Sequence, residues 1–386
     1  MANKNLTNAK RAKNDEFYTQ YSDIQKEIGA YLEYNPVVFR DKVVYCNCDD
    51  PFESNFFRYF VLNFNKLNLK QLITTSYKPS PIANTELVLQ PSLLPDYKDM
   101  VVKKLTVPKG RPKVTANKFI INEVRDIDGN GEFNLKDVAK QLKANKHNEW
   151  APLEGDGDFR SDESINLLKQ SDIVVTNPPF SLFREYIKQL VEHNKKFLII
   201  GNMNAITYKE VFPLLKDNKV WLGNNYKVNA GAMFFEIPEA IANLEQVREI
   251  KTNESGKKVY ITRVQGVRWF TNLDHGRRHQ PLPLMTEAEV IKFVTKKPFE
   301  KYDNYNAIDV SLVKNIPSDY SGVMGVPMSV FDKHSPEQFE ILGSDYNVKE
   351  GLLPKLVNPK WKGKLDRGYV NGKRFYTRIF IKHNKE

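Results

Sequence analysis

Residues 172–186, DIVVTNPPFSLFREY, carry the clearest structural signal in this chain of 386 residues. The apolar run 173–176 is typical of a buried strand, and apolar residues recur at helical spacing from Leu182 to Val191. Between the two lies the turn Asn177-Pro178-Pro179-Phe180, and Ser181 is the expected helix cap. A strand, a turn and a helix in this order predict an α/β fold.

The same order of elements occurs near the start of the chain. Residues 42–46 form a short apolar run, which is followed by polar Asn47, Asp49 and Asp50, as at the carboxyl end of a buried parallel strand. Asp50 is positioned to cap the next helix, whose apolar face runs from Phe52 to Phe64. With further strands expected over 71–76, 196–201 and 219–223, the sequence predicts a mostly parallel sheet with helices on both faces.

The net charge of +11 suits a polyanionic partner. The last 36 residues contain ten Lys or Arg residues against two acidic ones, with Trp361, Tyr369, Phe375 and Tyr376 interleaved. Basic groups neutralise phosphates and aromatic rings pack on bases, so this segment either contacts nucleic acid or forms a solvated basic tail. The alternating residues 375–381 predict an ordered strand within it.

The basic residues expected to contact the nucleic acid fall in two places. His275-Gly-Arg-Arg-His279 offers Arg277 and Arg278 for phosphate or base contacts, with a solvated basic loop as the alternative. Lys373, Arg374 and Arg378 are the candidates in the C-terminal segment.

Nothing in the sequence points to a membrane or to secretion. The chain contains no apolar run of ~18 residues, and its start lacks the apolar core of a secretory signal. The two cysteines, Cys46 and Cys48, are separated by one residue and are expected to be reduced. We therefore expect a cytoplasmic protein.

The α/β pattern lapses in two regions, which suggests three parts. Residues 1–80 and 151–270 are expected to form the catalytic domain, and 81–150 an insertion. Residues 271–386, which contain a helix capped by Thr286 with Glu289, are expected to form a second domain for a partner.

The Asn-Pro-Pro-Phe turn fits the methylation of a planar amine. A residue before proline is held extended, which places Asn177 and Pro178 at the sheet edge where ligands bind. The Asn177 side chain and the Pro178 carbonyl can accept both protons of an adenine amine, whose lone pair is otherwise delocalised into the ring. Phe180 can stack on a base extruded from the duplex, and Pro179 stiffens the turn. The alternative is a merely structural turn.

Five segments together carry a resemblance to a known family: NDEFYTQY at 14–21, VVYCNCDDP at 43–51, GDGDFR at 155–160, residues 172–186, and MGVP at 324–327. In these, the chain resembles the EcoRI-type adenine-specific DNA methyltransferases over most of its length outside the insertion. The resemblance implies a class I, Rossmann-like methyltransferase fold, S-adenosylmethionine as cofactor and a C-terminal target-recognition domain. It further implies methylation of a flipped adenine in double-stranded DNA, either beside a cognate restriction endonuclease acting on the same site or as an orphan modification.

The resemblance also assigns residues to the cofactor. Phe17, Tyr18 and Thr19 match the segment that closes over its methionine end, the alternative being an amphipathic entry helix. Asp158 and Phe159 match the pair that contacts its adenine, the alternative being a surface turn.

The first strand-to-helix turn is implied to bind the methionine and ribose of the cofactor through Asn47, Asp49 and Asp50. This turn lacks the Gly-x-Gly that most class I enzymes have there, which leaves the individual contacts open. Asp50 is then either a cofactor ligand or only a helix cap.

Residues 126–137, DIDGNGEFNLKD, are spaced like an EF-hand calcium loop, with Gly131 at the turn. The expected oxygen ligands are Asp126, Asp128, Asn130, Glu132 and Asp137. Because the twelfth position is Asp rather than Glu, the loop either binds a structural calcium ion or forms an acidic turn, and catalysis is not expected to depend on it.

Three other functions compete with DNA methylation. The same turn occurs in enzymes that methylate RNA adenines or protein glutamines, and RNA is the closer rival because the distal region is basic. A DNA-binding regulator on the same fold is the third, although the intact Asn177-to-Phe180 turn argues against it.

Overall fold

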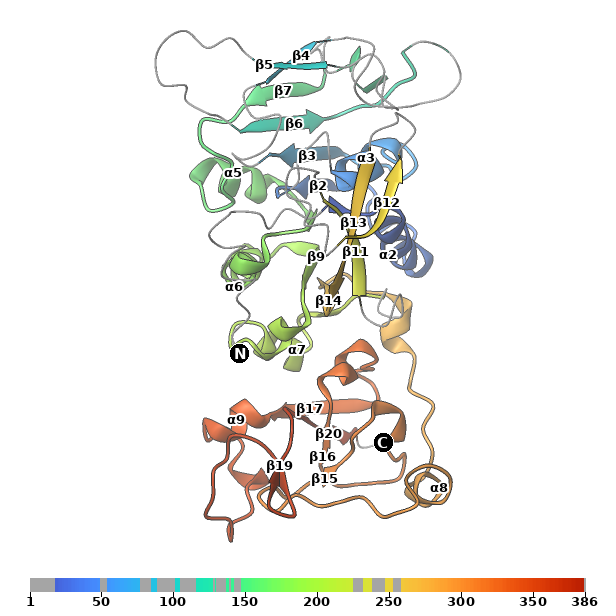
Figure 1. Ribbon diagram of the computed structural model, residues 1–386. Coiled ribbons are helices and arrows are strands. Elements are labelled where there is room, and N and C mark those ends of the chain that lie inside the picture. The colour runs from blue at the N-terminus through green and yellow to red at the C-terminus, as the bar shows by residue number, and fades with distance from the viewer. Residues whose placement is uncertain are drawn as a thin grey trace. The chain divides into compact units, whose positions relative to one another are not determined.

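The computed structural model describes residues 18–48, 54–76, 85–88, 101–104, 116–127, 129, 137–138, 140–141, 147–224, 232–237, 247–252 and 258–384. The chain divides into two compact units (Figure 1). The first comprises Met1–Tyr208 and Gly223–Leu273, and the second comprises Lys209–Leu222 and Asp274–Glu386.

A large sheet runs through the first unit. Its centre is four parallel strands in the order β9-β8-β2-β3, with bounds Lys196–Asn202, Ile173–Thr176, Val43–Cys46 and Gln71–Thr75. Antiparallel strands flank them: β14 (Val267–Thr271) beside β9, then β6 (Asn117–Ile121) and β7 (Glu149–Pro152) beyond β3. Strand β6, from the segment expected to be an insertion, thus extends the sheet.

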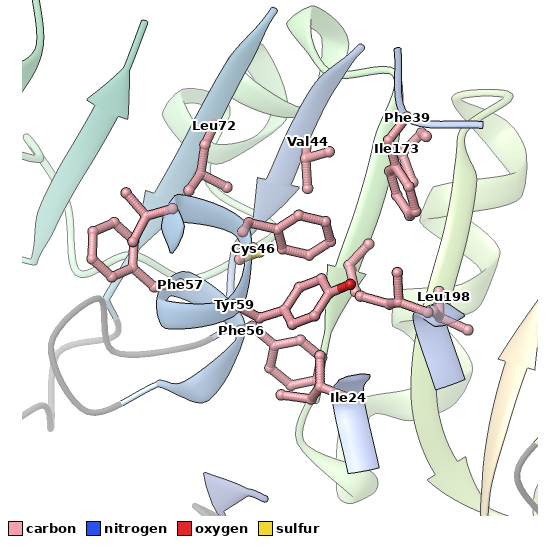
Figure 2. Packing of buried hydrophobic residues seen from close by; sticks show 14 of the residues in the cluster. Ile24, Phe39, Val44, Cys46, Phe56, Phe57, Tyr59, Leu72, Ile173 and Leu198 are labelled. Carbon is pink, nitrogen blue, oxygen red and sulfur yellow. The ribbon is translucent and has the colours of Figure 1, made fainter. Parts of the chain in front are cut away.

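Both faces of this sheet are covered, because successive side chains of a strand point to opposite sides. Val44, Cys46 and Leu72 pack with Phe56 and Phe57 in one apolar cluster (Figure 2). That cluster draws on helices α2 (Tyr21–Tyr34) and α3 (Asn55–Leu62). The alternate residues of the same strands are equally buried on the other side, where α5 (Asp162–Gln170) contacts β2 and α6 (Phe183–Glu192) contacts β9.

Two expected helix caps are wrong. Ser54, not Asp50, caps α3, and its hydroxyl accepts from Phe56 N at 3.1 Å. Ser181 caps nothing, because the chain leaves the Asn-Pro-Pro-Phe turn through a 3₁₀ helix, η1 (Phe180–Leu182), and α6 begins directly after it. The backbone supplies the bonds that a cap would otherwise provide.

A second sheet in the first unit has the order β1-β11-β13-β12 and is antiparallel. Its strands are Tyr18–Thr19, Ala232–Ile237, Lys258–Gln265 and Val247–Thr252. Strand β13 continues into β14 through Gly266, which has φ +71°. A separate hairpin pairs β4 (Thr85–Val88) with β5 (Val101–Lys104).

The second unit is built on a smaller sheet with the order β15-β16-β20-β17. Its strands are Ile308–Asp309, Met324–Val326, Ile379–His383 and Phe339–Ser344. A hairpin, β18 (Tyr369–Val370) and β19 (Lys373–Arg374), precedes β20. The second unit also contains the short strand β10 (Trp221–Leu222) and the helices α7 (Phe212–Lys216), α8 (Glu287–Val290) and α9 (Asp345–Lys349).

The capping box of Thr286 and Glu289 at the start of α8 is confirmed. The strand expected over 375–381 begins only at Ile379. Before it, Phe375 packs against an apolar cluster and Arg378 forms a buried ion pair with Asp309. None of the helices in the described part of the chain combines the length and apolar character needed to cross a membrane.

Candidate active site

Two asparagine-bearing turns meet at the carboxyl edge of the large sheet. Asn47 directly follows β2 and Asn177 directly follows β8, and these parallel strands are hydrogen-bonded neighbours, with Tyr45 opposite Val174. Cys48 N donates to Thr176 Oγ1 at 3.2 Å, which joins the two turns. This edge is where open α/β sheets bind ligands.

The Asn177-to-Phe180 turn is partly buried, and the Oδ1 atom of Asn177 is itself shielded from solvent. Asn177, Pro179 and Phe180 are half-buried, whereas Pro178 is buried. Pro179 is extended, with φ −55° and ψ 122°, and its carbonyl accepts from Leu182 N at 2.9 Å. Phe180 packs partly against the apolar cluster of Figure 2. One half-buried amide and one half-buried ring can therefore face a ligand together.

Asn47 is held through both of its oxygen atoms and is only 3% exposed. Its backbone carbonyl accepts from Thr75 Oγ1 at 3.3 Å, at the end of β3. Its side-chain Oδ1 accepts from the hydroxyl of Tyr186 on α6 and, at 3.6 Å, from Cys48 Sγ. The prediction from sequence did not include Tyr186; the available signal was a tyrosine on the apolar face of a helix.

The segment with Asp158 and Phe159 reaches the same edge through Gly157. This glycine has φ +74°, and a Cβ there would lie 2.1 Å from the carbonyl oxygen of Ser76, the residue after β3. Only glycine permits so close a backbone approach. The ring of Phe159 is 5% exposed and lies 5.0 Å from that of Tyr186, edge to face.

Asp158 is engaged by Arg160, whose Nε donates to Oδ1 at 2.9 Å and whose Nη2 donates to Oδ2 at 2.7 Å. These hydrogen bonds hold the pKa of Asp158 below its ordinary value. Oδ1 also accepts from Arg160 N, whereas Oδ2 accepts a single bond from the described residues. A carboxylate oxygen has two lone pairs, so Oδ2 can still accept from an adenine amine.

The first described residues of the N-terminal segment lie in a strand and not in an entry helix. Tyr18 and Thr19 form β1, and the Thr19 carbonyl accepts from Asn55 Nδ2 at 2.8 Å, at the start of α3. The Thr19 hydroxyl is buried without a hydrogen-bond partner in the described part of the chain. A buried orphan hydroxyl is costly, and a polar ligand would satisfy it. Phe17, Asp49 and Asp50 lie outside the described residues.

The calcium loop is described only in part. Asp137 is fully buried and accepts from Ile127 N at 3.0 Å, and exposed Asp126 accepts from Gly129 N at 2.8 Å. Asp128, Asn130 and Glu132 lie outside the described residues. The described residues contain no cluster of three metal-ligating side chains. Calcium binding stays a prediction.

Three arginines expected to contact DNA are engaged within the second unit. Arg278 is 9% exposed; its guanidinium lies 3.7 Å from the ring of Trp221 and donates to Asp274 at 3.2 Å. Arg277 donates to the carbonyl of Asp332. These contacts hold both side chains in place within the second unit.

Arg378 is likewise inside, at 6% exposure, with Nε 2.8 Å from Asp309 Oδ1. Lys373 and Arg374 differ, because β19 presents both to solvent, although Arg374 also donates to Asp366 at 2.7 Å. Tyr376 is 85% exposed, more than any other large apolar side chain described. Among the five basic residues expected to contact DNA, Lys373 and Arg374 are thus the exposed ones.

Comparisons with known proteins agree on one family. The family described as "Adenine-specific methyltransferase EcoRI" matches residues 5–384. The chain is 41% identical to the type II methyltransferase M.EcoRI of Escherichia coli over 383 residues, covering 99% of this chain and 97% of the relative. It is 34% identical to M.MpnI of Mycoplasma pneumoniae over 380 residues, covering 98% and 97%. No solved structure gives a significant match.

Proposed function

Since the chain belongs to the EcoRI adenine-specific methyltransferase family, we propose that it transfers a methyl group from S-adenosylmethionine to the N6 amine of an adenine flipped out of double-stranded DNA. The observation that carries this proposal is the meeting of the Asn47 and Asn177 turns at one sheet edge. The relatives do not favour methylation of RNA or a non-catalytic regulator.

Asn177 and the Pro178 carbonyl are the groups that act on the amine. By accepting both amine protons, they favour a pyramidal nitrogen whose lone pair is free to attack the methyl group. Phe180 stacks on the base and offsets part of the cost of extruding it, which is a few kcal/mol. Pro179 holds the turn extended, so the reaction depends on positioning rather than on a covalent intermediate.

Residues at the same edge fit S-adenosylmethionine, which supplies an electrophilic methyl group. Asn47 and the orphan Thr19 hydroxyl suit its polar methionine and ribose parts. Phe159 would contact its adenine, and Asp158 Oδ2 would offer an acceptor to the adenine amine. The four parallel strands with these turns at their carboxyl ends support the class I, Rossmann-like arrangement. Tyr18 and the turn with Asp49 and Asp50 stay assigned to the cofactor by the resemblance.

We assign target recognition to residues 271–386, catalysis to 1–80 and 151–270, and an insertion to 81–150. Lys373 and Arg374 are the proposed phosphate contacts, and Tyr376 the proposed base or sugar contact, because they are exposed. Arg277, Arg278 and Arg378 stay candidates for DNA contact, although their side chains are engaged within the second unit. We further propose that the protein acts in the cytoplasm, with a restriction endonuclease of the same specificity as its natural partner.

The test compares wild type with Asn177→Ala, using radiolabelled S-adenosylmethionine and unmethylated plasmid DNA digested to nucleosides. Label in N6-methyldeoxyadenosine is expected, and the variant should lose at least about 100-fold in rate, as when a transition-state hydrogen bond is removed. Asn63→Ala is the matched control, because Asn63 is half-buried and its amide donates to Tyr59 O at 2.9 Å in the C-cap of α3. Label in RNA or protein instead of DNA would overturn the proposal.

A further inference from the structure

One buried tyrosine connects the segments of the candidate active site. Tyr186 lies on α6, the helix that follows the Asn177 turn, and its side chain is fully buried. Its hydroxyl donates to Asn47 Oδ1, and its ring packs edge to face on Phe159 at 5.0 Å. One turn further along α6, Gln189 Nε2 donates to the Phe159 carbonyl at 3.0 Å. A single helix therefore holds two segments that lie far apart in the sequence.

Packing alone does not call for a tyrosine at this position. The buried face of α6 is otherwise apolar, formed by Phe183, Ile187 and Leu190. A buried hydroxyl costs free energy unless it has a partner, and phenylalanine would fill the same space without that cost. The hydroxyl is satisfied by Asn47 and so is part of how the first turn is built.

The hydrogen bond fixes which way the Asn47 amide faces. Oδ1 is used inside the protein, by Tyr186 and by Cys48 Sγ. The NH₂ end has no acceptor among the described residues. An amide held in this way offers two donors to a ligand at the carboxyl edge of the sheet, where the cofactor's carboxylate and ribose oxygens are acceptors.

We propose that Tyr186 is a positioning residue for S-adenosylmethionine: its hydroxyl orients the Asn47 amide with the donors toward the cofactor, and its ring seats Phe159 against the cofactor adenine. The proposal rests on the assignment of Asn47 and Phe159 to the cofactor. It also connects the cofactor site with the catalytic turn, because α6 follows Asn177 through η1.

Tyr186→Phe tests the hydroxyl, because it keeps the ring contact and removes only the donor. Titration calorimetry with the product S-adenosylhomocysteine should show a Kd about 10-fold higher, as expected for one buried hydrogen bond. The KM for S-adenosylmethionine should rise by a similar factor, while kcat at saturating cofactor stays within about two-fold. A merely structural residue would not separate KM from kcat.

Tyr31→Phe is the matched control. Tyr31 is also fully buried in the first unit, and its hydroxyl donates to Glu27 Oε1 at 2.9 Å on α2. This variant should lower thermal stability without changing the Kd for S-adenosylhomocysteine. An equal rise in Kd for both variants would mean that any lost buried hydroxyl weakens the site, and would overturn the proposal.

A double-mutant cycle with Asn47→Ala tests whether Tyr186 acts through Asn47. If it does, Tyr186→Phe causes no further rise in Kd once Asn47 is alanine. Additive effects, or no effect of Tyr186→Phe alone, would overturn the proposal. Should Tyr186→Phe fail to fold, Gln189→Ala tests the same helix through Phe159, with a rise in Kd expected and an unchanged Kd contradicting it. Wild-type protein that binds no S-adenosylhomocysteine would instead refute the proposed function.

Discussion

The turn after β2 and the hairpin β18-β19 are both assigned to ligands, but they are built in opposite ways. Around Asn47, side chains are buried and hydrogen-bonded to one another. In the hairpin the turn and the β19 side chains of Lys373 and Arg374 are exposed. The backbone of the turn is anchored, since Asp303 accepts from Gly372 N at 2.8 Å and from Asn371 N at 3.3 Å.

The difference fits the ligands that we propose for the two regions. A small cofactor is bound by a few polar groups whose directions must be set beforehand, which favours a buried and interlocked site. A DNA backbone is bound by charges that remain hydrated until contact, which favours exposed cations on a fixed backbone. Changes at matched positions in the two regions should therefore have different effects.

The largest difference is expected for two glycines with the same φ of +74°, Gly157 and Gly372. Gly157→Ala places a Cβ 2.1 Å from Ser76 O, so the backbone must move. We expect the unfolding free energy to fall by about 3 kcal/mol or more, and the variant to lose cofactor binding as well. Gly372→Ala meets nothing within 4 Å and should cost only the left-handed conformation, about 1–2 kcal/mol.

Urea unfolding and calorimetry with S-adenosylhomocysteine measure both quantities. Equal losses for the two variants would contradict the close approach at Gly157. Retained cofactor affinity in Gly157→Ala would contradict the placement of Asp158 and Phe159 beside the cofactor.

Much of the geometry of the candidate active site could be predicted because its signals are local. The short apolar runs before Asn47 and Asn177 mark buried strands, and parallel strands end at one edge, so the meeting of these turns follows from the sequence. The cap of α3 could not be predicted in this way, because Asp50 with Glu53 and Ser54 both have capping chemistry. Only the position where the helix begins, Asn55, decides between them.

The remaining misses depend on partners that are distant in the sequence. The bond from Tyr186 to Asn47 joins residues 139 positions apart, and no local pattern encodes it. Arg278 and Arg378 look like surface cations in the sequence, but Asp274 and Asp309 hold them inside. A basic residue's neighbours in the chain do not reveal whether a carboxylate faces it in the fold.

A smaller effect should separate the two regions by pH. Arg160 lowers the pKa of Asp158 in the first unit, whereas burial raises the pKa of Asp345 in the second to about 6. Asp345 is fully buried, and its Oδ2 accepts from Arg378 N at 2.6 Å. Since its ordinary pKa is 3.8, the folded state holds this proton more tightly than the unfolded chain does. Its contribution to stability is therefore full below about pH 4 and declines as the pH rises to about 6.

Asp345→Asn keeps an acceptor for Arg378 N and removes the titration. Relative to wild type, the variant should gain on the order of 2 kcal/mol in unfolding free energy between pH 4 and pH 7. Urea unfolding of the full chain at pH 4, 5, 6 and 7 measures the difference. A difference that stays constant with pH would show that Asp345 does not titrate in this range.

The smallest expected effect concerns the exposed hairpin and distinguishes charge from ring. Lys373→Ala with Arg374→Ala should weaken binding to plasmid DNA by roughly 10-fold, and the slope of log K against log salt should become shallower by about 2, because two phosphate contacts no longer release counterions. Tyr376→Ala should weaken binding by a similar factor and leave the slope unchanged, since a stacked ring releases no counterion. Lys66→Ala with Lys70→Ala removes the same charge from exposed positions of the first unit and should leave the slope as in wild type. Equal slopes for the two double variants would mean that only net charge matters, and that the hairpin is no specific DNA contact.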